Sequence, residues 1–427
     1  MVRSLLAALL AGHLAFNTAF AAEGPVSAIR AGRLVDVVTG KVLSDQVLIV
    51  RGDRIEGIGS ASAVSIPAGA KIIDLSGSTV LPGLIDTHTH VTSDPTLPPY
   101  HGYGVSHPRL ALKGAANAKA TLLAGVTTIR DVGATGYTDI ALRDAINDGD
   151  VPGPRMLVSG PALGITGGHC DDNMLAPEFE HESDGVADSV DGVRRVVRRN
   201  VKYGADLIKY CGTGGVFSKG TKVGAQQYTA AEVAALIDEA HMHGRKVAVH
   251  AHGADGIKVA IRAGVDTVEH ASLIDDEGLQ LARKFGTFLS MDIYNTEYTQ
   301  TEGPKRGELE EFLRKDREVA AIQRENFRKA VKLGIKLTMG TDTGVHRHGD
   351  SPKQLAIMVR YGMTPMQAIQ AATLVGADAL GLKNQIGALA PGYFADIIAV
   401  EGDPIANIQL LENVQFVMKA GEVYKSK

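Results

Sequence analysis

An alternation of short apolar segments with longer helical segments fills the middle of this chain, and it limits the fold more than any other feature. The apolar segments end at His90, Asp131, Ser159, Tyr210, His250, His270, Met291 and Thr341. Helical segments follow them at 109–124, 138–148, 184–203, 230–243, 254–263, 275–285, 308–333 and 365–376. Eight strand–helix units over roughly 300 residues predict a (β/α)8 barrel, an α/β fold with its chemistry at the C-terminal strand ends.

Two further features favour parallel strands covered by helices. The apolar segments are nearly continuous, as in parallel strands that are buried on both faces. Several helical segments close with a glycine, such as Gly125, Gly204 and Gly244, which fits a left-handed helix cap. An open doubly wound sheet is the alternative, but its glycine-rich loop should follow the first strand. Here the glycine-rich text Gly212–Gly215 follows the fourth.

Short segments rich in valine and isoleucine flank the barrel text at both ends of the chain. They lie at 28–31, 33–38, 46–51, 54–58 and 71–75, and again at 395–400, 414–419 and 423–424. Turn residues such as Gly and Asp separate them, which is typical of short strands. We therefore predict a small β-sandwich built from residues 22–80 and 385–427, next to a catalytic barrel over residues 81–384.

The first residues have the pattern of a secretory signal peptide. Arg3 precedes an apolar run from Leu5 to Phe20, and the text ending at Ala21 has a small-x-small cleavage pattern. The alternative, a membrane anchor, needs a longer run. We expect residues 1–21 to be removed and the protein to be secreted or periplasmic, with no membrane contact after cleavage.

Charge and cysteine content narrow the partners and the redox chemistry. The formal net charge is -4 and no long run of Lys or Arg occurs, so nucleic acid is not an expected partner. Cys170 and Cys211 are the only cysteines of the 427 residues. An exported protein could join them in a disulfide, but we expect two separate buried thiols.

Metal-binding residue types lie at the ends of four predicted strands. His88 and His90 are two residues apart on the first strand, so their side chains project together. The fifth and sixth strands end at His250 and His270, and Asp342 directly follows the eighth. Imidazoles with a carboxylate suit a divalent transition metal. Because these residues meet only if the strands assemble in order, the sequence predicts a metal site at the strand ends.

Lys209 stands at the end of the otherwise apolar fourth strand. A buried ammonium is costly without a partner, so a salt-bridged lysine is one interpretation. The other begins from burial beside cations, which lowers the pKa of the amine. Such an amine can react with carbon dioxide and become a carbamate, a two-oxygen anion able to bridge two metals.

Together these residues resemble the amidohydrolase superfamily, in its binuclear class with a carboxylated lysine. The flanking text 81–86 and 391–396 is similar too, and the resemblance covers essentially the whole mature chain. It implies two divalent cations per subunit, most simply Zn2+, with Mn2+, Co2+ or Fe2+ as alternatives. One would be held by His88, His90 and Asp342, the other by His250 and His270. The N6-carboxylated Lys209 and a hydroxide would bridge them.

The resemblance also implies catalytic roles. Asp342 would take the proton of the attacking hydroxide and pass it to the leaving amine. His169 would support the carbonyl oxygen as negative charge develops. Spacing adds His252, two residues past His250, which would share its direction and reach substrate; the alternatives are support of a metal ligand or a place in the core. Weaker candidates for the substrate pocket are Tyr210, Tyr228, His346 and Arg347.

Within the superfamily, the mononuclear deaminases carry a His-x-x-Glu pattern after the fifth strand, and here Gly253 stands in place of that glutamate. The text from Lys209 to Gly215 is similar to bacterial dipeptidases and carboxypeptidase-like enzymes, and to ochratoxin-hydrolysing amidohydrolases. This implies hydrolysis of N-acyl amino acids or dipeptides with release of the C-terminal residue, including ochratoxin A to ochratoxin alpha and phenylalanine. Alternatives are an Xaa-Pro dipeptidase, a cyclic amide or lactone hydrolase, and a non-catalytic metal-dependent binding protein. The resemblance further implies a homo-oligomer, with an octamer as one candidate.

Overall fold

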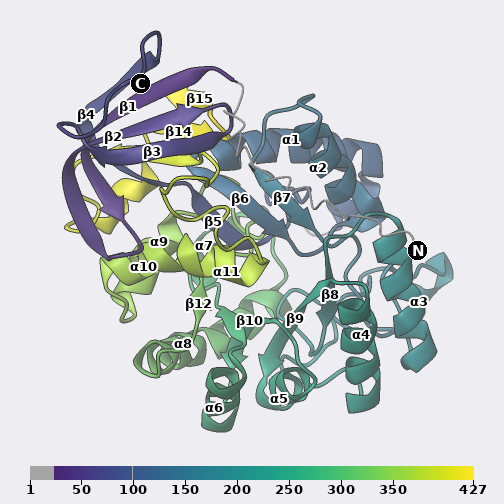
Figure 1. Cartoon of the computed structure of the whole chain (residues 1–427). Coiled ribbons are helices and arrows are strands. Elements are labelled where there is room, and N and C mark those ends of the chain that lie inside the picture. Colours follow the sequence, from purple (N-terminus) through teal and green to yellow (C-terminus); the bar gives the residue numbers. More distant parts are fainter. Residues whose placement is uncertain (1–23, 99) are drawn as a thin grey trace, which may run out of the picture.

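Strands from both ends of the chain form one seven-stranded sheet at one side of the molecule (Figure 1). The computed structural model describes residues 24–98 and 100–427, so the expected signal peptide lies outside it. The strands of this sheet are β1 (Val26–Asp36), β2 (Lys41–Arg51), β3 (Arg54–Ser60), β4 (Lys71–Pro82), β13 (Ile397–Glu401), β14 (Phe416–Lys419) and β15 (Glu422–Ser426). Their order is β15-β14-β13-β4-β1-β2-β3. We predicted a sandwich of two packed sheets here, whereas these seven strands form a single sheet.

The terminal sheet joins the two ends of the chain through its central strands. β13 pairs antiparallel with β4, and Ile397 lies opposite Pro82. β4 also pairs with β1, in parallel. Ile29, Leu48, Val80, Ile397 and Phe416 share one buried apolar cluster on this sheet. Residues more than 300 positions apart in the sequence therefore stabilise the same sheet.

The central strands form two parallel sheets. One contains β8 (Leu207–Cys211), β9 (Lys246–Gly253), β10 (Thr267–Leu273), β11 (Phe288–Ser290) and β12 (Leu337–Thr338). The other contains β5 (Leu84–Thr89), β6 (Val126–Asp131) and β7 (Arg155–Val158). The predicted parallel α/β architecture is present, but as sheets of five and three strands and not as one continuous closed sheet.

Backbone hydrogen bonds connect the two parallel sheets at both of their edges. At one junction, the Asp206 N–H donates to the carbonyl oxygen of Val158 at 2.8 Å, next to β8 and β7. At the other, the Thr87 N–H of β5 donates to the carbonyl oxygen of Met339, just past β12, at 2.9 Å. The strand ends of both sheets consequently face the same space.

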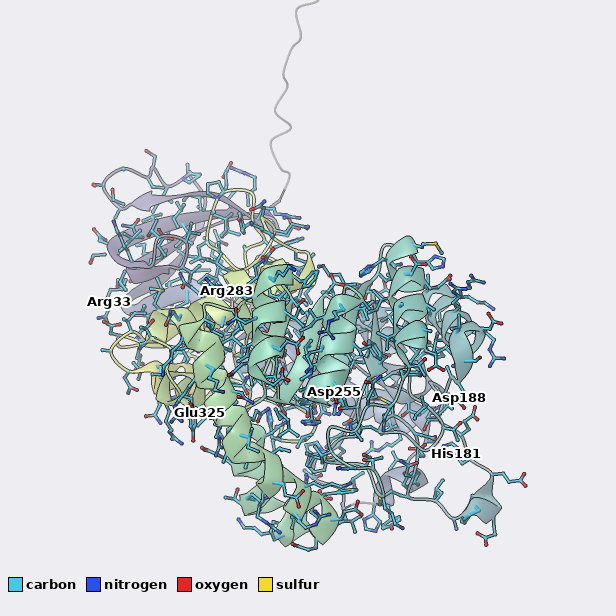
Figure 2. The ribbon with its side chains drawn as sticks, turned by 90° about the horizontal axis from the view of Figure 1, so that it is seen from below. Arg33, His181, Asp188, Asp255, Arg283 and Glu325 are labelled. Carbon is cyan, nitrogen blue, oxygen red and sulfur yellow. A yellow bond between two sulfur atoms is a disulfide. The ribbon has the colours of Figure 1, made fainter. Side chains whose placement is uncertain are left out.

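Helices cover the outer side of these strands (Figure 1). They are α1 (His107–Leu123), α2 (Thr138–Asn147), α3 (Ser189–Lys202), α4 (Ala230–Met242), α5 (Ala254–Arg262), α6 (Asp276–Phe285), α7 (Asn295–Glu302), α8 (Glu310–Lys332), α9 (Lys353–Arg360), α10 (Pro365–Ala371) and α11 (Leu374–Leu380). In Figure 2, Asp255, Arg283 and Glu325 mark α5, α6 and α8 along one side of the molecule. Across residues 24–98 and 100–427, no helix is long and apolar enough to cross a membrane.

Local sequence signals set the helix ends, and burial sets their packing. α4 begins at a capping box, in which the Thr229 side chain accepts a hydrogen bond from the Glu232 N–H. α6 ends at Gly286, whose φ of 71° is the left-handed conformation that glycine tolerates. The main core lies between strands and helices and includes Val249 of β9 and Ile257 of α5, both fully buried. This packing holds the strand ends in place and leaves the loops that follow them free to carry functional groups.

Candidate metal centre

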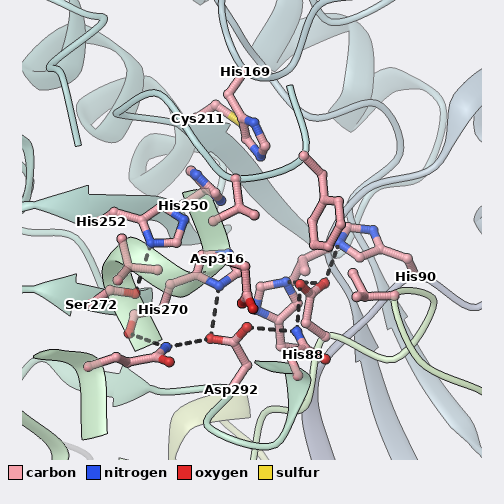
Figure 3. Close-up of a pocket in the computed structure, with 18 of the residues that line it drawn as sticks. His88, His90, His169, Cys211, His250, His252, His270, Ser272, Asp292 and Asp316 are labelled. Carbon is pink, nitrogen blue, oxygen red and sulfur yellow. Dashed lines mark hydrogen bonds and ion pairs between the residues drawn. The ribbon is translucent and has the colours of Figure 1, made fainter. Parts of the chain in front are cut away.

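The C-terminal ends of the parallel strands surround a cavity of about 280 Å³ (Figure 3). Most of its polar lining comes from the residues that the sequence singled out. They are His88, His90, His169, Lys209, His250, His252, His270 and Asp342. These side chains come from strands far apart in the sequence, so the fold brings them to one place.

His88, His90 and Asp342 form the first group of candidate metal ligands. The Nε2 atoms of His88 and His90 each lie 3.3 Å from Oδ1 of Asp342. His88 is on β5 and His90 directly follows it, while Asp342 lies four residues past the end of β12. Strands β5 and β12, which meet where the two parallel sheets join, therefore bring three donor atoms together.

Buried partners fix the orientation of this first group. His88 Nδ1 donates to Oε2 of Glu269 at 3.0 Å, and Glu269 Oε1 accepts from the Arg130 guanidinium at 2.7 Å. His90 Nδ1 donates to the carbonyl oxygen of Gly133 at 2.9 Å. Burial opposes the charge on Glu269, but Arg130 and His88 outweigh it and lower the pKa of this carboxyl. Because each Nδ1 carries its proton, each Nε2 keeps a free lone pair, the arrangement found in metal-binding histidines.

His250, His252 and His270 form the second group. His270 Nδ1 donates to Oδ1 of Asp292 at 2.9 Å, and His252 Nδ1 lies 2.8 Å from the Ser272 hydroxyl. The Nε2 atom of His250 is buried and has no hydrogen-bond partner within the described residues. Burial is the main cause that holds the pKa values of His250 and His252 well below the usual histidine value. Neutral imidazoles with available nitrogens are the form that binds a metal.

A third grouping connects the other two. Donor atoms of His270, Asp292 and Asp342 lie within 4.8 Å of one another. Asn295 Nδ2 donates both to Oδ2 of Asp292, at 2.7 Å, and to Oδ2 of Asp342, at 3.1 Å. The two histidine groups are therefore adjacent parts of one site. Nitrogen and carboxylate-oxygen donors in such sets fit one or two divalent transition-metal ions.

Two of the candidate ligands have strained backbones. His270 has a φ of 67° and Asp342 a φ of 56°. Left-handed conformations are uncommon for residues other than glycine, and they concentrate at functional sites. At His270 the strand pairing between β10 and β9 also shifts register before Leu273. Both features turn the strand ends so that these side chains enter the cavity.

Lys209 lies in the middle of β8 with its side chain toward the cavity and only 3% of its surface exposed. Burial lowers the pKa of its amine to about 8, although the charges of Glu269 and Asp342 act in the opposite direction. The amine is therefore far easier to deprotonate than that of a lysine in water.

His169 lies in the loop after β7 and covers one side of the second histidine group. Its ring stacks on that of His250 with the ring centroids 3.9 Å apart. Its Nδ1 lies 2.8 Å from the Ser218 hydroxyl. Burial, followed by the charges of His270 and Lys209, lowers its pKa to about 3, so the ring is neutral at pH 7.

A disulfide joins the His169 loop to the lysine strand. Cys170 and Cys211 are bonded, with their Cα atoms 5.9 Å apart and both residues at the cavity wall. The expectation of two separate buried thiols was wrong. The sequence alone could not show whether the two cysteines pair, because the distance between them depends on how the loop folds back over β8.

The remaining predicted pocket residues lie elsewhere. Tyr210 is fully buried and packs against Tyr228, whose hydroxyl donates to the carbonyl oxygen of Ala187. His346 is also buried, with Nε2 3.1 Å from the Thr341 carbonyl oxygen, and Arg347 borders a separate surface hollow. None of the four is among the cavity-lining residues, so their positions do not support substrate contact there.

Several residues that complete the site were not predicted from the sequence. Asp292, which orients His270, follows the predicted end of the seventh strand at Met291. Arg130 and Glu269 lie inside buried strands, where a charge requires a partner. That requirement was a usable signal, although it could not say which charges pair.

The chain is similar to known proteins along most of its length. The model of the amidohydrolase family matches residues 79–424. The ochratoxinase of Aspergillus niger is 31% identical over 437 aligned positions, which cover 94% of this chain and 87% of that protein. A crystal structure of an Xaa-Pro dipeptidase with bound methionine in its active site superposes with a TM-score of 0.86 at 36% identity, covering 94% of this chain and all of that one. A prolidase complexed with N-methylphosphonate-L-proline also gives a TM-score of 0.86, at 28% identity and with coverages of 94% and 100%.

Proposed function

This chain belongs to the amidohydrolase family, and from that premise we propose that it is a metal-dependent hydrolase of dipeptides and N-acyl amino acids that releases the C-terminal residue. The observation that carries the proposal is the pair of adjacent donor groups in one cavity, His88–His90–Asp342 and His250–His252–His270. A site of this kind has a place for two divalent cations, and its imidazole-rich donors favour Zn2+. Bound there, such ions lower the pKa of water and polarise the scissile carbonyl.

Asp342 is the proposed proton carrier. Its Oδ1 faces His88 and His90, while its Oδ2 accepts a hydrogen bond from Asn295. Nearby His88 and His90 outweigh burial and hold the pKa of Asp342 well below its usual value, so it starts the reaction as a carboxylate. From this position Asp342 accepts a proton from the attacking water and delivers it to the departing amine nitrogen.

His169 is the proposed support for the carbonyl oxygen. Its ring is neutral, and a Ser218 hydroxyl that donates to Nδ1 would leave the ring proton on Nε2. An Nε2–H donor at the cavity wall can stabilise negative charge that develops on the substrate oxygen. His252 stays a candidate for a substrate contact, since it lines the cavity, and its grouping with His250 and His270 makes it a candidate metal ligand as well.

We also propose that Lys209 carries an N6-carboxyl group. Its amine would attack carbon dioxide, form a C–N bond and release one proton, leaving a carbamate between the two donor groups. The support is the buried amine with its lowered pKa at the cavity wall. A Lys209→Ala protein should lose at least one of two metal ions per chain by elemental analysis, whereas full metal content with the full rate would exclude the carbamate.

Two relatives direct the choice of substrate. The similarity to ochratoxinase makes ochratoxin A, an amide of phenylalanine, one compound to assay. The similarity to an Xaa-Pro dipeptidase favours Xaa-Pro dipeptides as a second candidate. Both are acyl derivatives of an amino acid with a free C-terminal carboxylate. The proposal therefore concerns that shared chemical class and leaves the side chains to measurement.

We also propose that the two parallel sheets are parts of one eight-stranded barrel. Residues 81–384 would then form the catalytic unit. The hydrogen bonds Asp206–Val158 and Thr87–Met339 at the two sheet junctions support this interpretation. We further propose an exported, oxidising location, which would favour the Cys170–Cys211 disulfide.

The proposed function is tested with purified protein and a panel of dipeptides, N-acyl amino acids and ochratoxin A. Hydrolysis of at least one class should stop after chelation and return when Zn2+ is added. The Asp342→Asn protein should keep its metal, because an amide oxygen can still bind it, but lose turnover by at least a hundredfold. Hydrolysis that survives complete metal removal would reject the proposal, as would an Asp342→Asn protein with the original rate.

A further inference from the structure

Asp316, on the cavity side of helix α8, is a buried carboxylate that plays no part in either histidine group (Figure 3). Only 5% of its surface is exposed. Val319 and Gln323, three and seven residues further along α8, line the same cavity. This spacing places all three side chains on one helix face, so α8 presents a carboxylate to the substrate space.

The hydrogen bonds to Asp316 come from neutral groups. Thr296 Oγ1 donates to Oδ1 at 2.9 Å, and Gln300 Nε2 donates to Oδ2 at 2.7 Å. In the described part of the chain, no Lys, Arg or His lies within ion-pair distance of Asp316. Basic residues near Asp316 on α8 have other partners: Lys315 pairs with Glu311, Arg317 with Glu310 and Arg324 with Glu297.

A buried carboxylate without a cation is energetically expensive. The other buried acids of the site have such partners: Glu269 faces Arg130 and His88, and Asp292 faces His270. The two bonds from Thr296 and Gln300 would attach α7 to α8, but a neutral amide oxygen could accept them. Hydrogen bonds within the protein therefore explain why acceptor oxygen atoms lie at this position. They do not explain why residue Asp316 carries a negative charge.

Asp316 also lies close to the proposed reaction. Two consecutive residues of α7 connect the two carboxylates, because Asn295 donates to Asp342 and Thr296 donates to Asp316. Each carboxylate oxygen has two lone pairs, so Asp316 can accept further hydrogen bonds from a group inside the cavity. A ligand that reaches Asp342 with its scissile amide thus has neighbouring atoms within the space that Asp316 borders.

We propose that Asp316 binds a cationic nitrogen of the substrate, either the free α-ammonium of a dipeptide or the ammonium or guanidinium of a basic side chain. This inference rests on the proposed hydrolase function and refines its substrate class. It separates substrates with a positive charge next to the scissile amide from N-acyl derivatives of uncharged amino acids, which lack one.

Matched substrate pairs test the inference on the wild-type protein. Ala-Phe and N-propionyl-Phe differ only in the α-ammonium group, and Ala-Lys and Ala-norleucine differ only in the side-chain ammonium. We expect the member with the additional ammonium in at least one pair to have a kcat/KM at least tenfold higher, and the pair that shows it identifies the nitrogen that binds. In both pairs, an equal or higher kcat/KM for the member without that ammonium would overturn the inference while leaving the hydrolase function intact. Failure to hydrolyse Ala-Phe and Ala-Lys would also overturn the inference, whereas the hydrolase function is rejected only if the whole substrate panel fails.

The Asp316→Asn protein then tests the residue. We expect kcat/KM for the cationic substrate to fall at least tenfold and that for its neutral partner to change less than twofold, with metal content unchanged. Glu318→Gln is the matched control, since it removes the same charge from an exposed position of α8. It should leave kcat/KM unchanged for both substrates. An equal fall for both members of the pair would show that Asp316 only holds α7 against α8, and the inference would be wrong. The wild-type comparison stands on its own if the variant fails to fold.

Discussion

The imidazole of His88 has a defined orientation because its Nδ1 faces the buried carboxylate of Glu269. Glu269 is held in turn by Arg130 and by the Thr267 hydroxyl. None of these three residues lines the cavity. At the scale of single residues, therefore, metal affinity in the proposed centre depends partly on side chains that do not reach the cavity.

A Glu269→Gln substitution should weaken metal binding about 10–100-fold, because an amide orients and polarises the His88 ring less well than a carboxylate does. Competition with a chromophoric chelator measures this affinity. The matched control is Glu239→Gln, another buried glutamate, paired with Arg198 outside the cavity, which should leave metal affinity unchanged. Unaltered affinity in the Glu269→Gln protein would show that the carboxylate does not tune the site.

The sequence predicted some site residues well because strand geometry alone positions them. His88 and His90 are two residues apart, and the structure brings their Nε2 atoms to the same Asp342 oxygen. The same alternation explains the failure at Tyr210, which follows the cavity-facing Lys209 and so points to the other face of β8. Asp316 was not predictable, because its position depends on how α8 packs over the strand ends.

At the scale of elements, the sequence located the parallel strands closely but divided the later helices wrongly. β6 ends at Asp131 as predicted, and β10 extends three residues past the predicted end at His270. α7 and α9 were missed, and one predicted helix over 365–376 is two, α10 and α11. The segment of α7, NTEYTQTE, has no apolar periodicity, so its helical state depends on contacts with α8 and not on local pattern.

The disulfide is an element-scale constraint, since it ties the loop that carries His169 to β8. Replacing both Cys170 and Cys211 with serine should lower the free energy of unfolding by about 2–4 kcal/mol, because the unfolded chain regains the entropy of an open loop. Urea denaturation measures the change. Thiol titration of the protein unfolded in denaturant without reductant should find no free thiol.

The same double variant should lose turnover without losing metal, since His169 is no longer held over His250. A variant with wild-type kcat would show that the loop keeps its position unaided. Two titratable thiols in the unfolded, unreduced protein would contradict the disulfide itself.

Asp266 joins three elements at the opposite ends of the strands. Its carboxylate accepts hydrogen bonds from the Val247 N–H at the start of β9, from His241 of α4 and from Lys246. Burial opposes ionisation, but these contacts outweigh it and lower the pKa of Asp266 from its usual value. Such a group stabilises the fold above its unfolded pKa, and this contribution is lost as the pH falls through the lower folded value.

An Asp266→Asn protein should therefore be less stable than wild type by roughly 1–2 kcal/mol at pH 7. The difference should shrink as the pH falls below about 4.5, because the carboxylate of the unfolded wild-type chain then begins to take up a proton while the folded one stays ionised. Paired urea titrations between about pH 4.5 and pH 3 measure it. A difference that grows over this range would contradict the assigned direction of the pKa shift.

At the scale of the whole molecule, the terminal sheet and the metal centre depend on each other through β4. This strand pairs with β13 from the other end of the chain and leads through Gly83 directly into β5, which carries His88. The sequence showed that both termini contribute short strands, because valine and isoleucine mark them. It could not show that they form one sheet, since strand order and pairing depend on contacts between segments more than 300 residues apart.

The central claim is that distant strand ends assemble one metal centre that performs the hydrolysis. Elemental analysis of the purified protein, made together with an assay on its best dipeptide or N-acyl amino acid before and after chelation, tests it directly. We expect close to two divalent ions per chain, loss of the reaction when they are removed, and recovery in proportion to the metal returned. A metal-free protein that hydrolyses the same substrate at the original rate would contradict the account.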